Sequence, residues 1–193
     1  MSFTNQGKLV LVLGGSRSGK SRFAEGLARR LGNKILYIAT AAVYDEEMAR
    51  RVQLHRDRRP AAWDTREEPL HVIEAVQESA NRYHVLLLDC LTLWLTNLLL
   101  NDDISGPATP WPDKEKYLLS LVTQLATTCQ NCRSSVVVVS NEVGLGLVPD
   151  NPLGRAFRDV AGSANQILAH YADEVYFVAA GLPIELKSRA CTI

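Results

Sequence analysis

The chain has 193 residues, of which 47% are hydrophobic and 22% are charged. This length suits a single domain, and a composition close to the globular average excludes a wholly disordered chain. Lysine plus arginine and aspartate plus glutamate each number 21, so the formal net charge is zero. A neutral chain lacks the broad positive field that attracts nucleic acid or an anionic membrane, so we expect a bound anion to be held by a local site.

The cellular setting follows from the cysteines and the apolar runs. Four cysteines are too few for a disulfide scaffold, and no secretory signal segment precedes the first apolar run. We therefore expect the protein in the reducing cytoplasm. The apolar stretches are far shorter than the ~20 residues that span a bilayer, so we expect no stable membrane insertion.

The first predicted elements are a strand, a loop and a helix. Residues 8–13 (KLVLVL) form an apolar run that ends at two glycines, as a buried strand does. Residues 19–31 follow with their apolar positions on one helical face, and Gly32 ends that helix. A second strand is predicted at 34–39.

Capping residues predict the next two helices. Asp45 is a suitable N-cap for a helix at 46–58, with acidic residues in its first turn. Thr65 and Glu68 have the spacing of a capping box, which predicts another helix running to about residue 82.

Strands and helices continue to alternate along the rest of the chain. Further strands are predicted at 84–90, 135–140, 174–179 and 184–187, further helices at 91–101, 113–130 and 153–171, and a loop at 101–112. Gly181 and Pro183 indicate that the last two strands form a hairpin. Because the strands are apolar on both faces, we expect one α/β domain over residues 1–193, with a mainly parallel sheet flanked by helices and one antiparallel edge.

The clearest motif is a phosphate-binding loop. Residues 14–21 (GGSRSGKS) match G-x-x-x-x-G-K-[ST] between a predicted strand and a predicted helix. In such a loop the backbone N–H groups cradle the phosphates of a nucleoside triphosphate, Lys20 reaches the β- and γ-oxygens, and Ser21 ligates Mg²⁺. Asp89 ends an apolar strand and is the expected Walker B partner of Mg²⁺; the alternative is a polar strand end.

A histidine among arginines is the second candidate site. His55 shares a helical face with Met48 and Val52, and five arginines lie between positions 50 and 59. A neutral imidazole is an available nucleophile toward phosphorus, and nearby guanidinium groups would stabilise the pyrophosphate that attack on an α-phosphate expels. The alternative is a hydrogen-bonded core histidine.

Three further features give weaker evidence for a function. Cys129 and Cys132 have a C-x-x-C spacing but lack a second ligand pair, which favours packing over zinc or redox chemistry. Glu142 follows a predicted strand and suits either orientation of an acceptor hydroxyl or a cap on the next segment. Arg155 and Asp159 are four residues apart on a predicted helix, where we expect an ion pair.

The sequence resembles the bifunctional adenosylcobinamide kinase / adenosylcobinamide-phosphate guanylyltransferase family of cobalamin biosynthesis. The resemblance is carried by the phosphate loop at 14–21, LYIATA at 36–41, the histidine segment at 45–63 and the long segment at 141–175. It covers nearly the whole chain, and the last two segments are specific to the family. It implies a RecA-like P-loop domain that assembles as a homotrimer.

The resemblance also implies two activities and their residues. The enzyme would phosphorylate adenosylcobinamide with ATP or GTP, then transfer GMP from GTP to adenosylcobinamide phosphate through a GMP-histidine intermediate, releasing pyrophosphate. His55 matches the guanylylated histidine. Guanine specificity rests on the resemblance alone, because no N-K-x-D base-reading string occurs.

The implied nucleotide contacts come from several segments. They are Gly14, Gly15, Ser16, Arg17, Ser18, Gly19, Lys20, Ser21, Ala39, Thr40, Ala41, Arg56, Asp57, Arg58, Arg59, Glu67 and Asp89. Two competing hypotheses remain: a small-molecule P-loop kinase in which His55 is a core residue, and a RecA-like module that signals to a partner in response to nucleotide.

Overall fold

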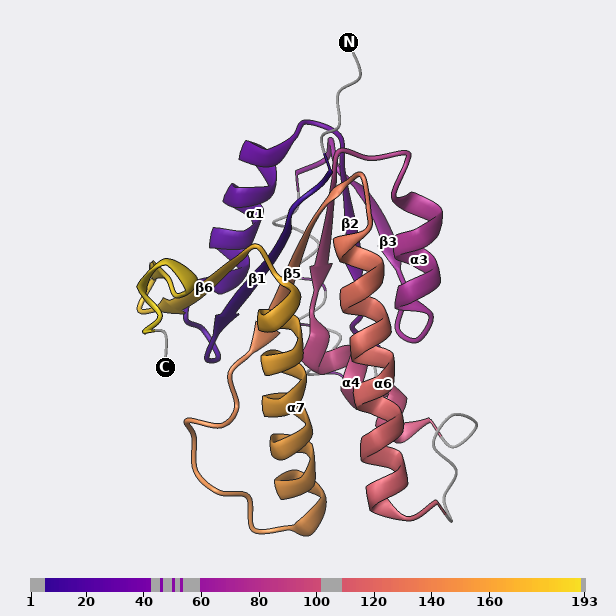
Figure 1. Ribbon diagram of the computed structural model, residues 1–193, viewed down its shortest axis with the longest axis vertical. Coiled ribbons are helices and arrows are strands. Elements are labelled where there is room, and N and C mark those ends of the chain that lie inside the picture. The colour runs from indigo at the N-terminus through magenta and orange to yellow at the C-terminus, as the bar shows by residue number, and fades with distance from the viewer. Residues whose placement is uncertain are drawn as a thin grey trace.

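The computed structural model describes residues 6–42, 46, 50, 53, 60–101 and 109–191. A seven-stranded sheet forms the centre of this part of the chain, and helices cover both of its faces (Figure 1). Within the described segments no helix has the length and apolarity needed to cross a bilayer.

The sheet confirms the predicted topology. Its strands are β1 (Leu9–Gly14), β2 (Ile35–Ala39), β3 (Asp64–Glu67), β4 (Val85–Asp89), β5 (Ser135–Asn141), β6 (Glu174–Ala179) and β7 (Leu182–Glu185). They lie side by side in the order β3-β2-β4-β5-β1-β6-β7. Every neighbouring pair is parallel except the β6–β7 hairpin, which is the expected antiparallel edge.

The helices that lie wholly within the described segments divide unequally between the two faces of the sheet. They are α1 (Lys20–Leu31), α3 (Val72–Ser79), α4 (Leu91–Leu100), α6 (Trp111–Gln130) and α7 (Pro152–Tyr171), followed by the short 3₁₀ helix η1 (Lys187–Arg189). Helix α1 covers one face, and the other four α-helices pack on the opposite face (Figure 1).

Each central strand therefore contributes to two cores. On β1, for example, Leu11 packs toward α3, α4, α6 and α7, whereas its neighbour Val12 packs toward α1. This follows from the alternation of side chains along a strand. The uninterrupted apolar runs of the sequence are thus explained by burial on both faces.

The predicted capping box is wrong. Thr65 lies in β3 and pairs with Tyr37 of β2, and α3 begins only after Glu68. The carboxylate of Glu68 accepts hydrogen bonds from the backbone N–H groups of Leu70 (3.4 Å) and His71 (2.9 Å), so it does satisfy amides near a helix start. The strand escaped prediction because it is a short, mostly exposed edge strand with no apolar run.

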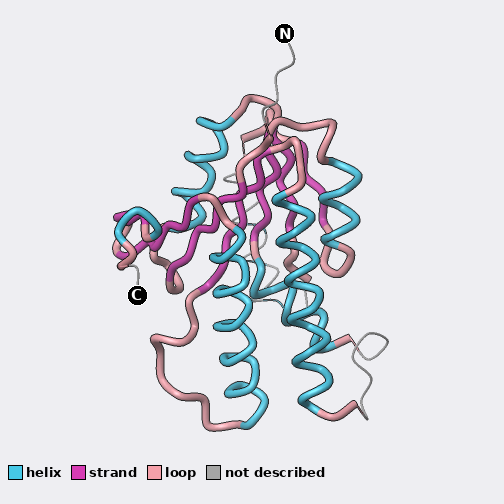
Figure 2. The backbone as a smooth tube through the Cα atoms, in the orientation of Figure 1, coloured by secondary structure: helices cyan, strands magenta, loops and turns pink. Residues whose placement is uncertain are grey.

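Two predicted segments lie largely outside the described residues. In the predicted helix at 46–58 the structure describes Glu46, Arg50 and Gln53, all three in helical conformation. Residues 102–108 of the predicted loop are also outside. The β5–α7 connection at 142–151 is described, and it is a long loop without helix or strand (Figure 2).

Candidate nucleotide site

Parallel pairing brings the ends of separate strands to one edge of the sheet. Gly14 lies opposite Asn141, and Ala39 lies between Glu67 on one side and Asp89 on the other. Ligands of open α/β sheets bind at this carboxyl edge. The fold therefore gathers predicted site residues from four segments of the chain.

The phosphate loop contains two residues with a left-handed backbone, of which one is a glycine. Arg17 and Gly19 have positive φ values of 57° and 95°, and Gly19 directly precedes α1, whose N-terminus points into the loop. A Cβ placed on Gly14 would lie 2.5 Å from Ser18 Oγ, so a side chain has no room there. Ser16 is exposed, and the Ser18 amide closes the turn by donating to Gly15 O at 3.2 Å.

The β6–β7 turn supports the loop from the neighbouring strand. The Gly181 N–H donates to Ser18 O at 2.8 Å, and a Cβ placed on Gly19 would approach the Gly181 Cα within 3.1 Å. Sequence reasoning predicted this hairpin but not its contact with the phosphate loop, because that contact depends on β6 pairing with β1.

Lys20 is the first residue of α1, and its side chain turns back toward the phosphate loop. Its Nζ donates to Gly15 O at 3.1 Å. Burial lowers the pKa of Lys20, and the negative forms of Cys90 and Asp89 act in the opposite direction. The lysine ammonium and the Asp89 carboxylate thus lie close enough to interact electrostatically.

Asp89 is held by a residue that sequence reasoning missed. The Tyr37 hydroxyl donates to Asp89 Oδ2 at 2.7 Å. Tyr37 is only 2% exposed and comes from the adjacent strand β2. The contact had no signal in the sequence, because it depends on the register between two strands.

Thr40, which follows β2, is hydrogen-bonded to Cys90, which follows β4. Its Oγ1 donates to Cys90 O and accepts from Cys90 N, both at 2.8 Å, and Asn97 Nδ2 donates to Thr40 O at 2.7 Å. Thr40 is fully buried, so it shapes this edge of the site, whereas the adjacent Ala41 is partly exposed.

Cys90 is a second residue of this edge that sequence reasoning did not assign. Its Sγ lies 3.2 Å from Thr92 Oγ1. Burial, followed by the charge of Asp89, raises the pKa of the Cys90 thiol to about 11. A thiol with this pKa stays protonated near neutral pH and is a poor nucleophile.

The predicted Mg²⁺ ligands fit that ion chemically. Ser21 offers a hydroxyl and Asp89 a carboxylate, and both are the hard oxygen donors that Mg²⁺ prefers. One carboxylate is typical of sites where substrate phosphates supply further ligands. Within the described residues, no cluster of three or more His, Cys, Asp or Glu side chains forms a protein-only metal cage.

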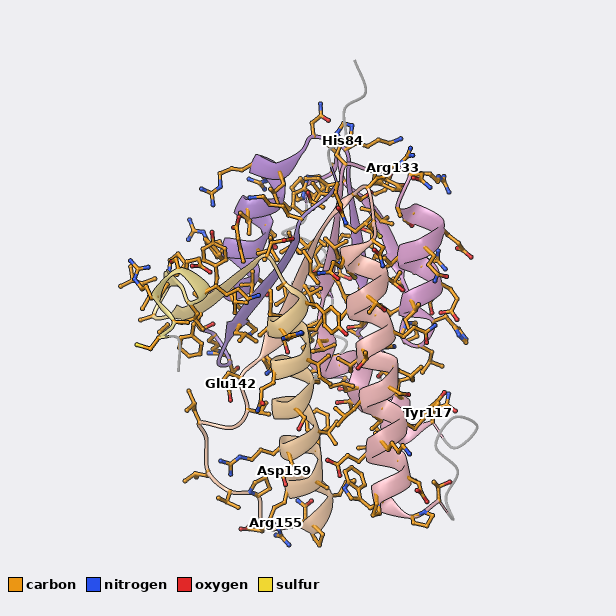
Figure 3. All side chains as sticks on the ribbon, viewed as in Figure 1. His84, Tyr117, Arg133, Glu142, Arg155 and Asp159 are labelled. Atoms are coloured by element: carbon orange, nitrogen blue, oxygen red, sulfur yellow. The ribbon has the colours of Figure 1, made fainter. Side chains whose placement is uncertain are left out.

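The remaining candidates have structural contacts. The carboxylate of Glu142, directly after β5, accepts a hydrogen bond from Gly144 N at 2.6 Å and so caps the following loop (Figure 3).

The predicted ion pair between Arg155 and Asp159 is wrong. The Arg155 guanidinium donates instead to the carbonyls of Pro149 (3.0 Å) and Asp150 (2.7 Å). No ion pair between Arg155 and Asp159 occurs among the described contacts. Backbone carbonyls exposed by the loop compete better for this arginine than a carboxylate one helical turn away.

The C-x-x-C cysteines are buried and unbonded to each other. Burial raises the pKa of both Cys129 and Cys132, and the Cys132 thiol donates to Thr128 O at 3.2 Å. Both side chains pack in the core between the sheet and α6.

A hollow of about 980 Å³ lies at the opposite edge of the sheet. His84 and Arg133, which precede β4 and β5, border it (Figure 3). Because amino and carboxyl ends of parallel strands lie at opposite edges, this hollow is separate from the phosphate loop.

The predicted nucleophile and its basic neighbours fall in a part of the chain that the structure does not describe. His55, Arg56, Asp57, Arg58 and Arg59 all lie outside the described residues. The assignment of His55 as a nucleophile therefore stays a prediction.

The fold and the sequence motif define a P-loop protein with a mainly parallel sheet. Strand β5 separates the strand that enters the phosphate loop from the strand that ends in Asp89. A sequence model of the family CobU, described as cobinamide kinase / cobinamide phosphate guanyltransferase, matches residues 10–186. The chain belongs to this family.

Individual relatives match over nearly their whole length. The chain is 42% identical over 183 residues to the bifunctional adenosylcobalamin biosynthesis protein CobU of Escherichia coli K12, covering 93% of this chain and 99% of the relative. It is 47% identical over 177 residues to the corresponding protein CobP of Pseudomonas aeruginosa, covering 92% and 96%. Among solved structures, the RadB recombinase aligns with 90% of this chain and 74% of its own, at 15% identity and a TM-score of 0.45.

Proposed function

We propose that this chain is a bifunctional enzyme of cobalamin biosynthesis. It phosphorylates adenosylcobinamide with ATP or GTP, and it then transfers GMP from GTP to adenosylcobinamide phosphate. The observation that carries the proposal is a family match over residues 10–186 that includes the phosphate loop. The convergence of Lys20 and Asp89 at the carboxyl edge of the sheet supports it.

In the kinase step, the loop amides and the N-terminus of α1 hold the phosphates of the nucleotide. An acceptor hydroxyl of adenosylcobinamide attacks the γ-phosphorus, and the nucleoside diphosphate leaves. Lys20 stabilises the charge on the transferred group. Mg²⁺, held by Ser21 and Asp89, supplies further charge neutralisation when bound.

In the guanylyl step, a ring nitrogen of His55 attacks the α-phosphorus of GTP. An N–P bond forms as the bond to pyrophosphate breaks. A phosphate oxygen of adenosylcobinamide phosphate then attacks the same phosphorus, which frees the histidine and yields adenosylcobinamide-GDP. Arg56, Arg58 and Arg59 neutralise the departing pyrophosphate.

Other nucleotide contacts belong to the same proposal. They are Gly14, Gly15, Ser16, Arg17, Ser18, Gly19, Ala39, Thr40, Ala41, Asp57 and Glu67. Glu67 ends β3 directly beside Ala39, at the same edge as the phosphate loop.

The proposed assembly is a cytoplasmic homotrimer. The β5–α7 loop exposes Leu145, Leu147 and Val148, with exposed fractions of 80%, 96% and 65%. A group of exposed large apolar side chains is typical of a surface that a partner covers. This loop is therefore the proposed contact between subunits, with an acceptor cleft at their interface.

A labelling experiment tests both steps. The protein is mixed with Mg²⁺ and GTP labelled at the α-phosphorus, then denatured. Wild-type protein should retain label through an acid-labile, alkali-stable bond, as a phosphoramidate does. His55→Ala should retain none but still phosphorylate adenosylcobinamide, whereas Lys20→Ala should lose phosphorylation most severely. A wild-type protein that phosphorylates without retaining label would be a kinase alone.

A further inference from the structure

Tyr37 and Asp89 meet diagonally across two paired strands. Tyr37 lies opposite Leu87, and Asp89 lies opposite Ala39, so the two side chains share one face of the sheet two residues apart in register. The phenol reaches along that face and donates to Asp89 Oδ2 at 2.7 Å.

We propose that Tyr37 is a positioning residue that holds the Asp89 carboxylate in place for a divalent cation bound with the nucleotide. The hydroxyl occupies Oδ2, which fixes the plane of the carboxylate and keeps its other lone pairs available. This inference rests on the metal role assigned to Asp89 under the proposed function.

The surroundings of Tyr37 make its hydroxyl a rigid donor. The ring is buried in the cluster formed by the sheet and α1, together with Ala24 and Leu27. A packed aromatic ring loses little further freedom when its hydroxyl forms a hydrogen bond. The Asp89 carboxylate, by contrast, belongs to a side chain that is only partly buried, at the last residue of β4.

The neutrality of the donor matters for the charge of the site. An ion pair between Asp89 and the nearby ammonium of Lys20 would neutralise the carboxylate and compete with the cation. A phenol orients the same carboxylate without cancelling its negative charge. Partners of this kind, which orient a ligand without touching the metal, commonly change metal affinity about 10- to 100-fold when they are removed.

The rival explanation is that the bond only joins β2 to β4. The chain offers two matched controls, because two other tyrosines donate to a carboxylate at 2.9 Å: Tyr83 to Asp64 and Tyr176 to Glu174. Asp64 begins β3 and Glu174 begins β6, so both controls lie toward the amino edge, away from the phosphate loop.

The experiment measures Mn²⁺ binding directly, with ADP present. Free Mn²⁺ is followed by electron paramagnetic resonance for wild type, Tyr37→Phe, Tyr83→Phe and Tyr176→Phe, and each protein is also melted. We expect the dissociation constant for Mn²⁺ to rise about 10-fold or more in Tyr37→Phe. The two control variants should stay within about twofold of wild type even where their melting temperatures fall.

Asp89→Asn separates failure of this inference from failure of the proposed function. If Asp89→Asn binds Mn²⁺ as wild type does, the metal role of Asp89 is wrong. If Asp89→Asn weakens binding and a folded Tyr37→Phe does not, only the positioning role is wrong.

The double variant gives a second test. Adding Tyr37→Phe to Asp89→Asn should weaken Mn²⁺ binding no further, since the phenol acts through the carboxylate. If Tyr37→Phe weakens Mn²⁺ binding as much in the Asp89→Asn background as in wild type, the inference is overturned. Should Tyr37→Phe fail to melt cooperatively, the bond is structural and the inference is likewise overturned.

Discussion

The backbone N–H of Gly181 donates to the carbonyl of Ser18 at 2.8 Å, so the β6–β7 turn braces the phosphate loop. Gly181 has a φ of +81°, and a Cβ placed on it would meet nothing within 4 Å. Any effect of an added methyl group would therefore come from backbone conformation and not from a clash. A substitution at Gly181 therefore tests whether the conformation of the β6–β7 turn affects the phosphate loop.

Gly181→Ala should weaken nucleotide binding. A left-handed backbone costs a residue with a Cβ about 1 kcal/mol, which the turn can relieve by shifting away from Ser18. We expect the dissociation constant for ADP to rise about 3- to 10-fold in a calorimetric titration. Gly162→Ala is the matched control, since Gly162 lies within α7 and also has open space around its Cβ position. That variant should bind ADP normally and be more stable by about 0.5–1 kcal/mol.

Lys20→Met should raise the thermal stability of the nucleotide-free protein while it abolishes the kinase activity. Burial lowers the pKa of Lys20, which means that the folded protein without nucleotide disfavours the charged ammonium. At pH values between the lowered pKa and 10.5, the unfolded chain binds more protons than the folded chain. The free energy of unfolding therefore rises as pH increases through this range. We expect Lys20→Met to melt about 1–3 °C above wild type at pH 7 without nucleotide, with the difference shrinking at higher pH.

The same Lys20→Met variant should lose the kinase step. ADP should also protect it less against thermal unfolding, because the lysine no longer contacts the phosphates. A variant that melts below wild type at pH 7 would show that the bond from Lys20 to Gly15 outweighs the burial of its charge.

The sequence predicted most of the fold because the central strands are buried on both faces. Runs such as residues 85–88 and 136–139 are apolar at every position, and each lies in the middle of the sheet. The phosphate loop was equally visible, since its glycines and Lys20 all lie within the short segment 14–21. Strand β3 was missed because its stability comes from pairing with β2 at an exposed edge, which leaves no apolar pattern.

The parts of the site that escaped prediction are contacts between segments that are brought together by the strand order of the sheet. The bond from Tyr37 to Asp89 and the bond from Gly181 to Ser18 each join segments that are far apart in the sequence. Their residue types are ordinary for a strand and a turn. Only the strand order and register, which sequence periodicity does not specify, bring them together.

Alkylation should distinguish the cysteines by burial. Cys191 is exposed, whereas Cys90, Cys129 and Cys132 are buried, and burial raises the pKa of each buried thiol. Native protein treated with iodoacetamide at pH 7.5 should therefore gain one adduct by mass spectrometry, on Cys191. Denatured protein should gain four, and the Cys191→Ser variant should gain none while native. Rapid native modification of Cys90 would contradict the described site.

The C-terminal turn should weaken in acid through Glu185. Its carboxylate accepts hydrogen bonds from the Ser188, Lys187 and Val175 backbone N–H groups at 2.6, 3.0 and 3.2 Å. Hydrogen bonding, chiefly from Ser188, lowers the pKa of Glu185 to about 2. A carboxyl whose pKa is depressed by folding contributes stability above its unfolded pKa of 4.5, and this contribution is lost as pH falls from there toward about 2.

Glu185→Gln should therefore lower the melting temperature at pH 7 and change it much less at pH 2.5, provided that the protein still melts cooperatively there. Glu115→Gln on α6 is the control, since Glu115 has no described bond of this kind, and it should change little at either pH. Hydrogen exchange at the amides of Lys187 and Ser188 gives a local readout, because the lost acceptor should speed their exchange at pH 7. Equal destabilisation by Glu185→Gln at both pH values would mean that the amide loses packing and not a charged acceptor.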